Sequence, residues 1–146
     1  MKIHILSIFM FFTAVSYGQT PENLISTFFQ VYKSNPSKAV DDLYGTNPWT
    51  VNSKEGIENM KREIASYTKD YMGDYYGNEL IIKQKCTESF ELHYFMVKYD
   101  RQPLKFVFEF YKPKDKWMLY SLLIDAEFDE DVEQAAKLGL VNKLQN

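Results

Sequence analysis

The chain has few of the residues that metal sites, disulfide frameworks and nucleotide-binding loops require. Its 146 residues include one cysteine and two histidines, and the six glycines form neither a G-x-G-x-x-G nor a G-x-x-x-x-G-K string. Cys86 has no partner for an internal disulfide, and we expect it to be buried or half-buried in a strand. His93 has no second pair of ligands at metal-binding spacing. The sequence therefore predicts no metal, no cofactor and no internal cross-link.

The chain also lacks an excess of positive charge. Its 17 basic and 20 acidic side chains give a formal net charge of -3, whereas proteins that bind nucleic acids usually need a basic excess to neutralise phosphates. A hydrophobic fraction of 45% and a charged fraction of 25% are typical of one compact domain with a real core. We expect a single domain over residues 19–146 with no nucleic-acid partner.

The amino-terminal residues carry the one long apolar run. Residues 1–18 begin with a positive charge, continue with an apolar stretch from Ile5 to Val15 and end in small residues up to Gly18. This pattern predicts a secretory signal peptide that is cleaved after Gly18. The stretch is shorter than the roughly 20 residues that span a bilayer, and no cysteine follows for a lipoprotein anchor. We expect a secreted or periplasmic protein whose mature chain has no membrane span.

Helical patterns come first in the mature chain. A threonine, a proline and a glutamate predict the start of an amphipathic helix over residues 20–35. Ser37 is the expected cap of a short second helix that stops at Gly45, and a third helix is predicted from Ser53 through Tyr71. A turn is expected at residues 74–76.

Strand patterns follow from residue 79 onward, where apolar residues change to a period of two. Strands are predicted at residues 79–87, 89–99, 103–112 and 116–127, and the short loops between them make neighbouring strands antiparallel. A last helix is predicted from Asp129 through Lys137. The expected fold class is α+β, with three amino-terminal helices packed on a curved four-stranded antiparallel meander.

The alternation within the strands predicts which side chains face the core. The third strand places four residues on one face: Leu104, Phe106, Phe108 and Phe110. The second strand has its more apolar phase at Phe90, Leu92, Tyr94 and Met96, which would put His93 on the outer face. The last strand is apolar in both phases, with Trp117, Leu119 and Leu123 on one side and Met118, Tyr120, Leu122 and Ile124 on the other. Such a strand needs cover on both faces, and a second subunit packed sheet to sheet predicts a homodimer.

The carboxyl-terminal half carries a resemblance to a known family. The hairpin turn Lys114-Asp115-Lys116, the following Trp117 and the apolar last strand ending at Asp125 resemble the NTF2-like superfamily and point to a group of small exported bacterial proteins within it. That superfamily wraps a curved sheet around a long first helix to form a cone. The resemblance implies a pocket between the helices and the concave sheet face, and frequent dimers through the outer face. It does not imply a chemistry, because the members include isomerases, dehydratases, binding modules and transport factors.

Two residues are weak candidates for catalysis. Asp125 shares the phase of Trp117 and Leu119, so it is predicted to face inward, where aromatic neighbours would raise its pKa. A solvated or ion-paired acid at the strand end is the competing interpretation. His93 is the only histidine outside residues 1–18. Six aromatic residues are candidates to line a ligand pocket, although aromatics at such spacing are often core: Trp49, Tyr32, Tyr67, Tyr71, Tyr94 and Trp117.

These patterns leave three hypotheses for function. The first is an exported NTF2-like domain that binds a small apolar ligand or a protein partner. The second is an enzyme like the polyketide cyclases (SnoaL-like) or ketosteroid isomerases, with Asp125 as base and a tyrosine as hydrogen-bond donor. The third is an interaction or immunity protein that acts through its outer sheet face. The sequence weighs against an enzyme without excluding one, and a cone filled by aromatic side chains would remove the enzyme's site.

Overall fold

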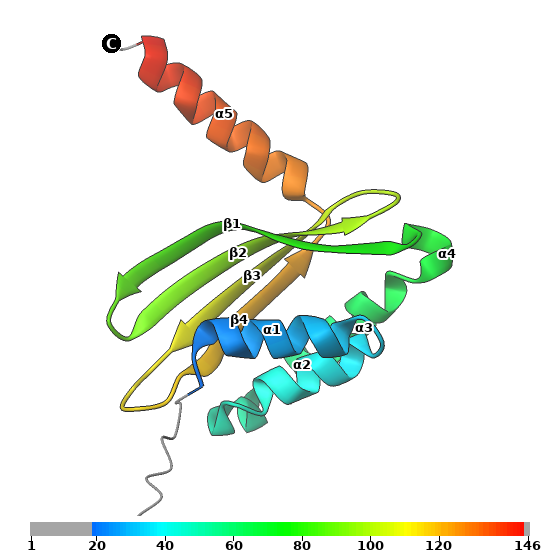
Figure 1. Ribbon diagram of the computed structural model, residues 1–146, viewed down its shortest axis with the longest axis vertical. Coiled ribbons are helices and arrows are strands. Elements are labelled where there is room, and N and C mark those ends of the chain that lie inside the picture. Colours follow the sequence, from blue (N-terminus) through cyan, green and yellow to red (C-terminus); the bar gives the residue numbers. More distant parts are fainter. Residues whose placement is uncertain (1–18, 145–146) are drawn as a thin grey trace, which may run out of the picture.

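The computed structural model describes residues 19–144, with side chains described through residue 140. The predicted signal peptide lies outside the described residues. Five short helices precede the sheet: α1 (Pro21–Tyr32), α2 (Pro36–Tyr44), the 3-10 helix η1 (Pro48–Ser53), α3 (Lys54–Ser66) and α4 (Lys69–Met72). The strands are β1 (Tyr75–Thr87), β2 (Phe90–Tyr99), β3 (Leu104–Tyr111) and β4 (Met118–Asp125), and α5 (Phe128–Leu144) follows. The fold is α+β with a four-stranded antiparallel sheet in the order β1-β2-β3-β4 (Figure 1).

Capping side chains mark where α1 and α2 begin. The predicted start of α1 is confirmed, because the Thr20 side chain accepts a hydrogen bond from the backbone of Asn23 at 3.3 Å. The cap of α2 is Asn35 rather than the expected Ser37. Its side chain accepts from the Lys38 backbone at 3.0 Å, which leaves Pro36 at the first helical position, where no N–H is needed.

The predicted third helix is divided in two. Helix α3 ends at Ser66, and Thr68 then caps the four-residue α4 by accepting a hydrogen bond from the backbone of Tyr71 at 3.3 Å. A threonine hydroxyl competes with the helical backbone for such bonds, so it is more stable as a cap than inside a helix. The expected turn at residues 74–76 is also wrong, because Tyr75 and Tyr76 already belong to β1.

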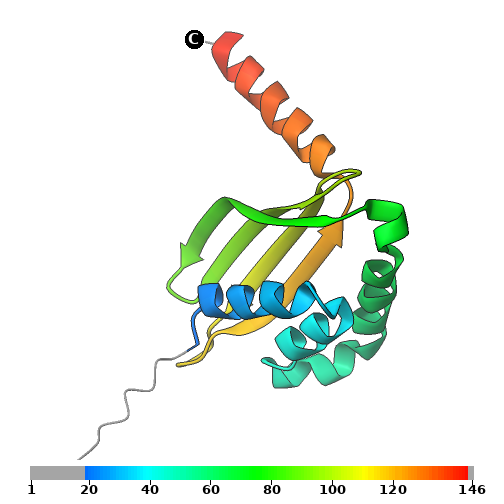
Figure 2. The same ribbon diagram turned by 45° about the vertical axis from the view of Figure 1, so that its right-hand side comes forward.

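Helix α1 lies across one face of the sheet (Figures 1 and 2). The rings of Phe28 and Phe108 are 5.2 Å apart between centroids, and those of Tyr32 and Phe106 are 5.3 Å apart. The predicted inward face of β3 is confirmed, since Leu104, Phe106, Phe108 and Phe110 are fully buried. Aromatic pairs at these distances contribute about 0.5–1.5 kcal/mol each beyond their burial. The interior between α1 and the sheet is therefore core.

A β-bulge reverses the expected alternation of β4. Glu109 pairs with Ser121 and Phe110 with Leu119, so Tyr120 is the extra residue on β4. Inward positions are then Leu119, Leu122 and Ile124, all buried, while Tyr120 and Leu123 are exposed on the outer face. The predicted assignment of residues to the two faces is wrong beyond the bulge, because the bulge moves every residue after it to the opposite face. The strand is still apolar on both faces, with Tyr120 and Leu123 on the outer one, so the premise of the homodimer prediction remains.

The predicted phase of β2 is also wrong. His93 pairs with Phe108 and Glu91 with Phe110, which places both polar side chains on the same face as the buried phenylalanines of β3. His93 is only 1% exposed. Because β2 is rich in apolar residues in both phases, its alternation cannot choose the inner face. The register with β3 makes that choice.

Helix α5 is held at its first turn and then extends away from the sheet (Figures 1 and 2). The Tyr94 hydroxyl donates to Asp131 at 2.9 Å, and the Lys105 ammonium lies 3.1 Å from Asp131 and 3.3 Å from Asp125. All side chains from residue 132 to residue 140 are exposed. The helix is longer than predicted, and its acidic first turn complements the helix dipole. Among the described residues, no helix combines the length and apolarity that crossing a membrane requires.

Gly73 offers a test of the connection between α4 and β1. Its φ of 80° is left-handed, and an added Cβ would collide with the Asp100 side chain, which accepts from the Asp74 backbone at 2.5 Å and from the Tyr76 hydroxyl at 2.7 Å. We expect Gly73→Ala to lower the free energy of unfolding by about 1–3 kcal/mol in a urea titration. Gly56→Ala, in α3 with open space around it, is the matched control and should be neutral or stabilising. Equal stability of the two variants would contradict the assigned role of Gly73.

Candidate functional site

A groove of about 360 Å³ opens between α1 and the inner side of β1 and β2. Its apolar walls are Ile25, Phe29, Leu80 and Phe95. Its polar lining consists of Glu22, Ser26, Gln30, Lys33, Asn78, Lys83 and His93. A volume of this size lies at the lower end of the range for small-molecule sites, and the mixture of apolar walls with few polar groups is typical of them.

The groove exists because β1 extends past the core at the edge of the sheet. Helix α1 packs its aromatic side chains on β2 and β3, and its opposite flank faces β1 across open space. All side chains of β1 from Glu79 onward are exposed, including Leu80, which is 51% exposed. The expected burial of Cys86 is wrong for the same reason, since it lies on this exposed part of the strand.

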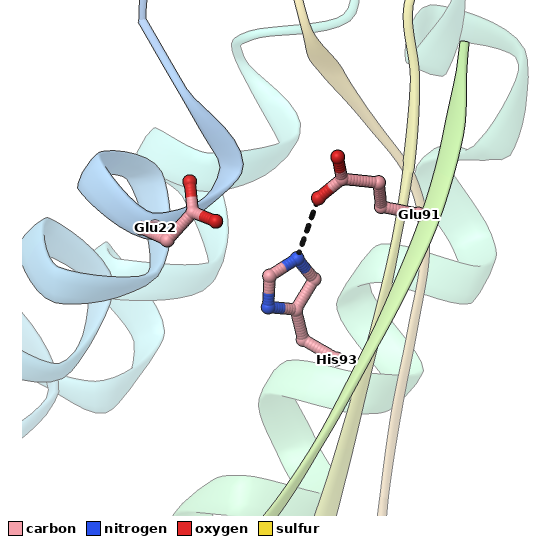
Figure 3. Close-up of side chains that lie close together, drawn as sticks. All are labelled: Glu22, Glu91 and His93. Atoms are coloured by element: carbon pink, nitrogen blue, oxygen red, sulfur yellow. Dashed lines mark hydrogen bonds and ion pairs between the residues drawn. The ribbon is translucent and has the colours of Figure 1, made fainter. Parts of the chain in front are cut away.

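Four ionisable side chains meet at one end of the groove. Glu22 comes from the first turn of α1, Lys83 from β1, and Glu91 and His93 from β2. Glu91 and His93 are two residues apart, so they share a face of the strand, and Lys83 is the β1 partner of His93. Figure 3 shows Glu22 on α1 facing the Glu91–His93 pair across the space between helix and strand. We call these four side chains the polar cluster.

The contacts within the polar cluster are short. His93 Nε2 lies 3.2 Å from Glu91 Oε2, and a carboxylate oxygen only accepts, so Nε2 donates this hydrogen bond. The other ring nitrogen, Nδ1, points toward α1 (Figure 3), and in the neutral ring that donates from Nε2 it is an acceptor. Lys83 forms an ion pair with Glu22 and lies 3.7 Å from Glu91. The cluster thus offers a ligand one oriented imidazole nitrogen.

Glu22 and Lys83 form an ion pair at the entrance of the polar cluster. Partial burial raises the pKa of Glu22, but hydrogen bonds from Lys83, the backbone and Thr20 outweigh it and lower this pKa to about 2. The hydrogen bond to Glu22 raises the pKa of Lys83 in turn. Both groups are therefore charged at neutral pH, while His93 and Glu91 are buried beside them.

The structure places Asp125 outside this site. Its carboxylate lies 3.3 Å from the ammonium of Lys105, on the face of the sheet opposite to α1. The expected inward orientation is wrong, because the bulge at Tyr120 shifts the phase of β4. The competing interpretation of Asp125 as an ion-paired acid at the strand end agrees with this geometry.

The six aromatic candidates do not share one pocket. Tyr32 and Tyr67 line a shallow hollow of about 380 Å³, where the Tyr32 and Tyr99 hydroxyls are 2.9 Å apart. Tyr94 holds Asp131 on the outer face. The remaining three lie near the surface: Trp49 is 74% exposed, Tyr71 lies under Arg101 at 4.2 Å, and Trp117 lies under Lys112 at 4.9 Å. None of the six lines the groove beside the polar cluster.

Sequence reasoning missed Glu22, Lys83 and Glu91. The Glu91-x-His93 spacing was a usable signal, because residues two apart on a strand share a face. The partnership of that face with Glu22 depends on how α1 crosses the sheet, and no local pattern contains that information. Comparisons of the chain with protein-family models, characterised proteins and solved structures found no match. The site is thus defined by its own geometry, as a side groove on an α+β domain.

The lowered pKa of Glu22 predicts a pH-dependent contribution to stability. Its folded-state pKa lies below the ordinary value of 4.5, so the ion pair with Lys83 stabilises the fold above about pH 4.5 and this contribution is lost as pH falls toward 2. The side chain is half exposed, and solvent screening limits the contribution to less than about 1 kcal/mol. We expect Glu22→Gln to lower the free energy of unfolding at pH 7 by less than about 1 kcal/mol in a chemical denaturation series.

The difference between Glu22→Gln and wild type should shrink as the pH of the series is lowered from 7 to about 3. Glu55→Gln, which changes an acid in the first turn of α3, controls for the helix dipole. A difference that stays constant with pH, or one that the control reproduces, would show that the pair with Lys83 does not stabilise the fold.

Proposed function

We propose that this protein is an exported binding domain of the NTF2-like type, and that the groove beside α1 takes a small molecule with an apolar body and one hydrogen-bond donor. One observation carries the proposal: an open groove with apolar walls ends on a buried, oriented histidine. The apolar walls contribute affinity but do not orient a ligand. The acceptor nitrogen of His93 orients it by binding its hydrogen-bond donor. The amide side chains of Gln30 and Asn78 add further polar contacts along the groove.

The NTF2-like assignment is supported by the α+β architecture, in which α1 crosses one face of an antiparallel meander. The pocket differs from the one that the resemblance implies. Phe28, Phe106 and Phe108 fill the interior of the expected cone, so the ligand site is proposed at its flank. Export is supported by the pattern of residues 1–18 alone.

Binding is proposed in preference to catalysis. The enzyme hypothesis needed Asp125 inside the cone beside a tyrosine hydroxyl, and Asp125 is paired with Lys105 on the other face. Within the groove, the lining includes no tyrosine among the described residues. A histidine held by a carboxylate is suited to fix a ligand's polar group, and this role needs no further partner.

A homodimer is the second proposal, and it now rests on the outer sheet face. This face exposes Ile82, Tyr120 and Leu123, which are 49%, 61% and 48% exposed. Half-buried Leu92, Met96 and Val107 continue the apolar surface between them. Burying an apolar sheet face of this kind is favourable, and a second copy of the chain packed face to face would bury it.

The ligand proposal predicts that a bulky side chain in the groove blocks binding. Ser26 is an exposed residue of α1 that lines the groove, so Ser26→Trp fills the space without changing the core. With the probe 1-anilinonaphthalene-8-sulfonate, we expect saturable fluorescence enhancement by the protein, lost in Ser26→Trp and kept in Ala65→Trp, which alters an exposed position of α3. Equal enhancement by both variants would place the probe elsewhere and count against the groove. Native mass spectrometry after exposure to extract of the source cells then identifies the natural ligand by its mass.

The dimer proposal predicts that a charge on the outer face separates the subunits. We expect sedimentation equilibrium to give a dimer mass at micromolar concentration for the wild type and a monomer mass for Leu123→Glu, because an unpaired carboxylate is costly to bury. Val51→Glu makes the same change at an exposed apolar residue of η1 and should leave the dimer intact. A wild-type monomer at high micromolar concentration would overturn the proposal.

A further inference from the structure

We propose that Glu22, Glu91 and His93 form a binding site for a Zn²⁺ ion at the end of the groove. Each side chain offers one ligand atom, and these atoms lie within 4.8 Å of one another. The inference does not need the proposed small-molecule ligand, because the three donors belong to the chain itself. An ion on Nε2 would leave the ring proton of neutral His93 on Nδ1, so the metal-bound ring would donate to the groove instead of accepting from it. It goes beyond the sequence, which predicted no metal because its candidates had no partners at ligand spacing.

The distances between the donors suit a small ion. Zn²⁺ binds nitrogen and carboxylate oxygen at about 2.0–2.2 Å, so two ligands of a tetrahedral site are about 3.4 Å apart. The 3.2 Å between His93 Nε2 and Glu91 Oε2 already matches one edge of such a site. Glu22 must close the remaining separation, and its half-exposed side chain in the first turn of α1 has the freedom to do so.

Two of the three donors, His93 and Glu91, are buried and held in place before an ion binds. His93 is 1% and Glu91 is 8% exposed, and their positions on β2 are fixed by the register with β3. Preorganised ligands lose little conformational entropy when an ion binds. Three protein donors leave a fourth position open toward the groove, which is the arrangement of zinc sites that bind a further molecule.

The position of Lys83 shows that this place attracts positive charge. Its ammonium contacts Glu22 and lies 3.7 Å from Glu91, between the two carboxylates that would hold the metal. Lys83 is 41% exposed on the edge strand, so it can turn toward solvent when an ion enters. The ammonium and the ion therefore compete for the same carboxylates.

The donor set favours zinc over Ca²⁺ and Mg²⁺. Ca²⁺ and Mg²⁺ prefer sites built of oxygen alone, whereas an imidazole nitrogen with two carboxylates suits Zn²⁺. Residues 19–146 contain a single histidine, so His93 is the only imidazole that this part of the chain can offer to the ion.

The test uses untagged residues 19–146, which contain the entire described core, titrated with Zn²⁺ in a calorimeter. We expect one ion per chain, bound with a dissociation constant tighter than about 1 mM. The single histidine signal in the NMR spectrum should shift with the same saturation. His93→Gln and Glu91→Gln should each weaken binding by about tenfold or more, because each removes a ligand. Melting curves recorded without metal show whether these variants fold.

Lys83→Ala keeps the test decisive if a buried variant fails to fold, since Lys83 lies on the surface. It removes the competing ammonium, so Zn²⁺ should bind several-fold more tightly than to wild type. Lys85→Ala makes the same charge change two residues along β1, at a lysine paired with Glu88 at 2.8 Å, and should leave the affinity unchanged.

Three outcomes would overturn the inference: no saturable Zn²⁺ binding, binding that leaves the histidine signal unmoved, or equal affinity of the two lysine variants. The small-molecule proposal is tested separately by repeating the fluorescence titration with EDTA present. Probe binding that survives chelation supports the groove on its own, and zinc binding in the Ser26→Trp variant supports the metal site on its own.

Discussion

The packing of α1 on the phenylalanine face of β3 is the interaction on which the rest of the molecule depends. Phe28 lies 5.2 Å from Phe108 and 6.2 Å from Phe106 between ring centroids, so one helix residue bridges neighbouring positions of the strand. Because these rings fill the space between α1 and β3, the groove lies at the flank of the helix. The same packing sets the angle at which α1 crosses the sheet, and this angle brings Glu22 within reach of β1.

The edge strand β1 forms the second wall of the groove beside α1. Strand β1 continues beyond the region that the helices cover, and its inner side chains have α1 on one side and solvent on the other. The groove is thus bounded by a rigid core at His93 and Phe95 and by an exposed edge at Leu80 and Lys83.

The outer face of the sheet is organised by a second polar contact. Lys105 is largely buried beside Asp125 and Asp131 of α5. Burial lowers its pKa less than the hydrogen bonds that its ammonium donates to these carboxylates raise it. This contact joins β3, β4 and the first turn of α5. The groove and the apolar outer face lie on opposite sides of the sheet, so binding at one leaves the other free.

The sequence by itself determined the order of helices and strands, the antiparallel meander and the buried face of β3. These features depend on local periodicity, capping residues and short loops, which act over a few neighbouring positions. The tertiary structure decided what faces inward elsewhere. The bulge at Tyr120 arises from the pairing of β4 with β3 and carries Asp125 to the outer face, and the register of β2 carries His93 to the inner one. Glu22 and His93 are far apart in sequence, and only the crossing of α1 over the sheet brings them together, because contacts between distant elements depend on global packing that no local pattern records.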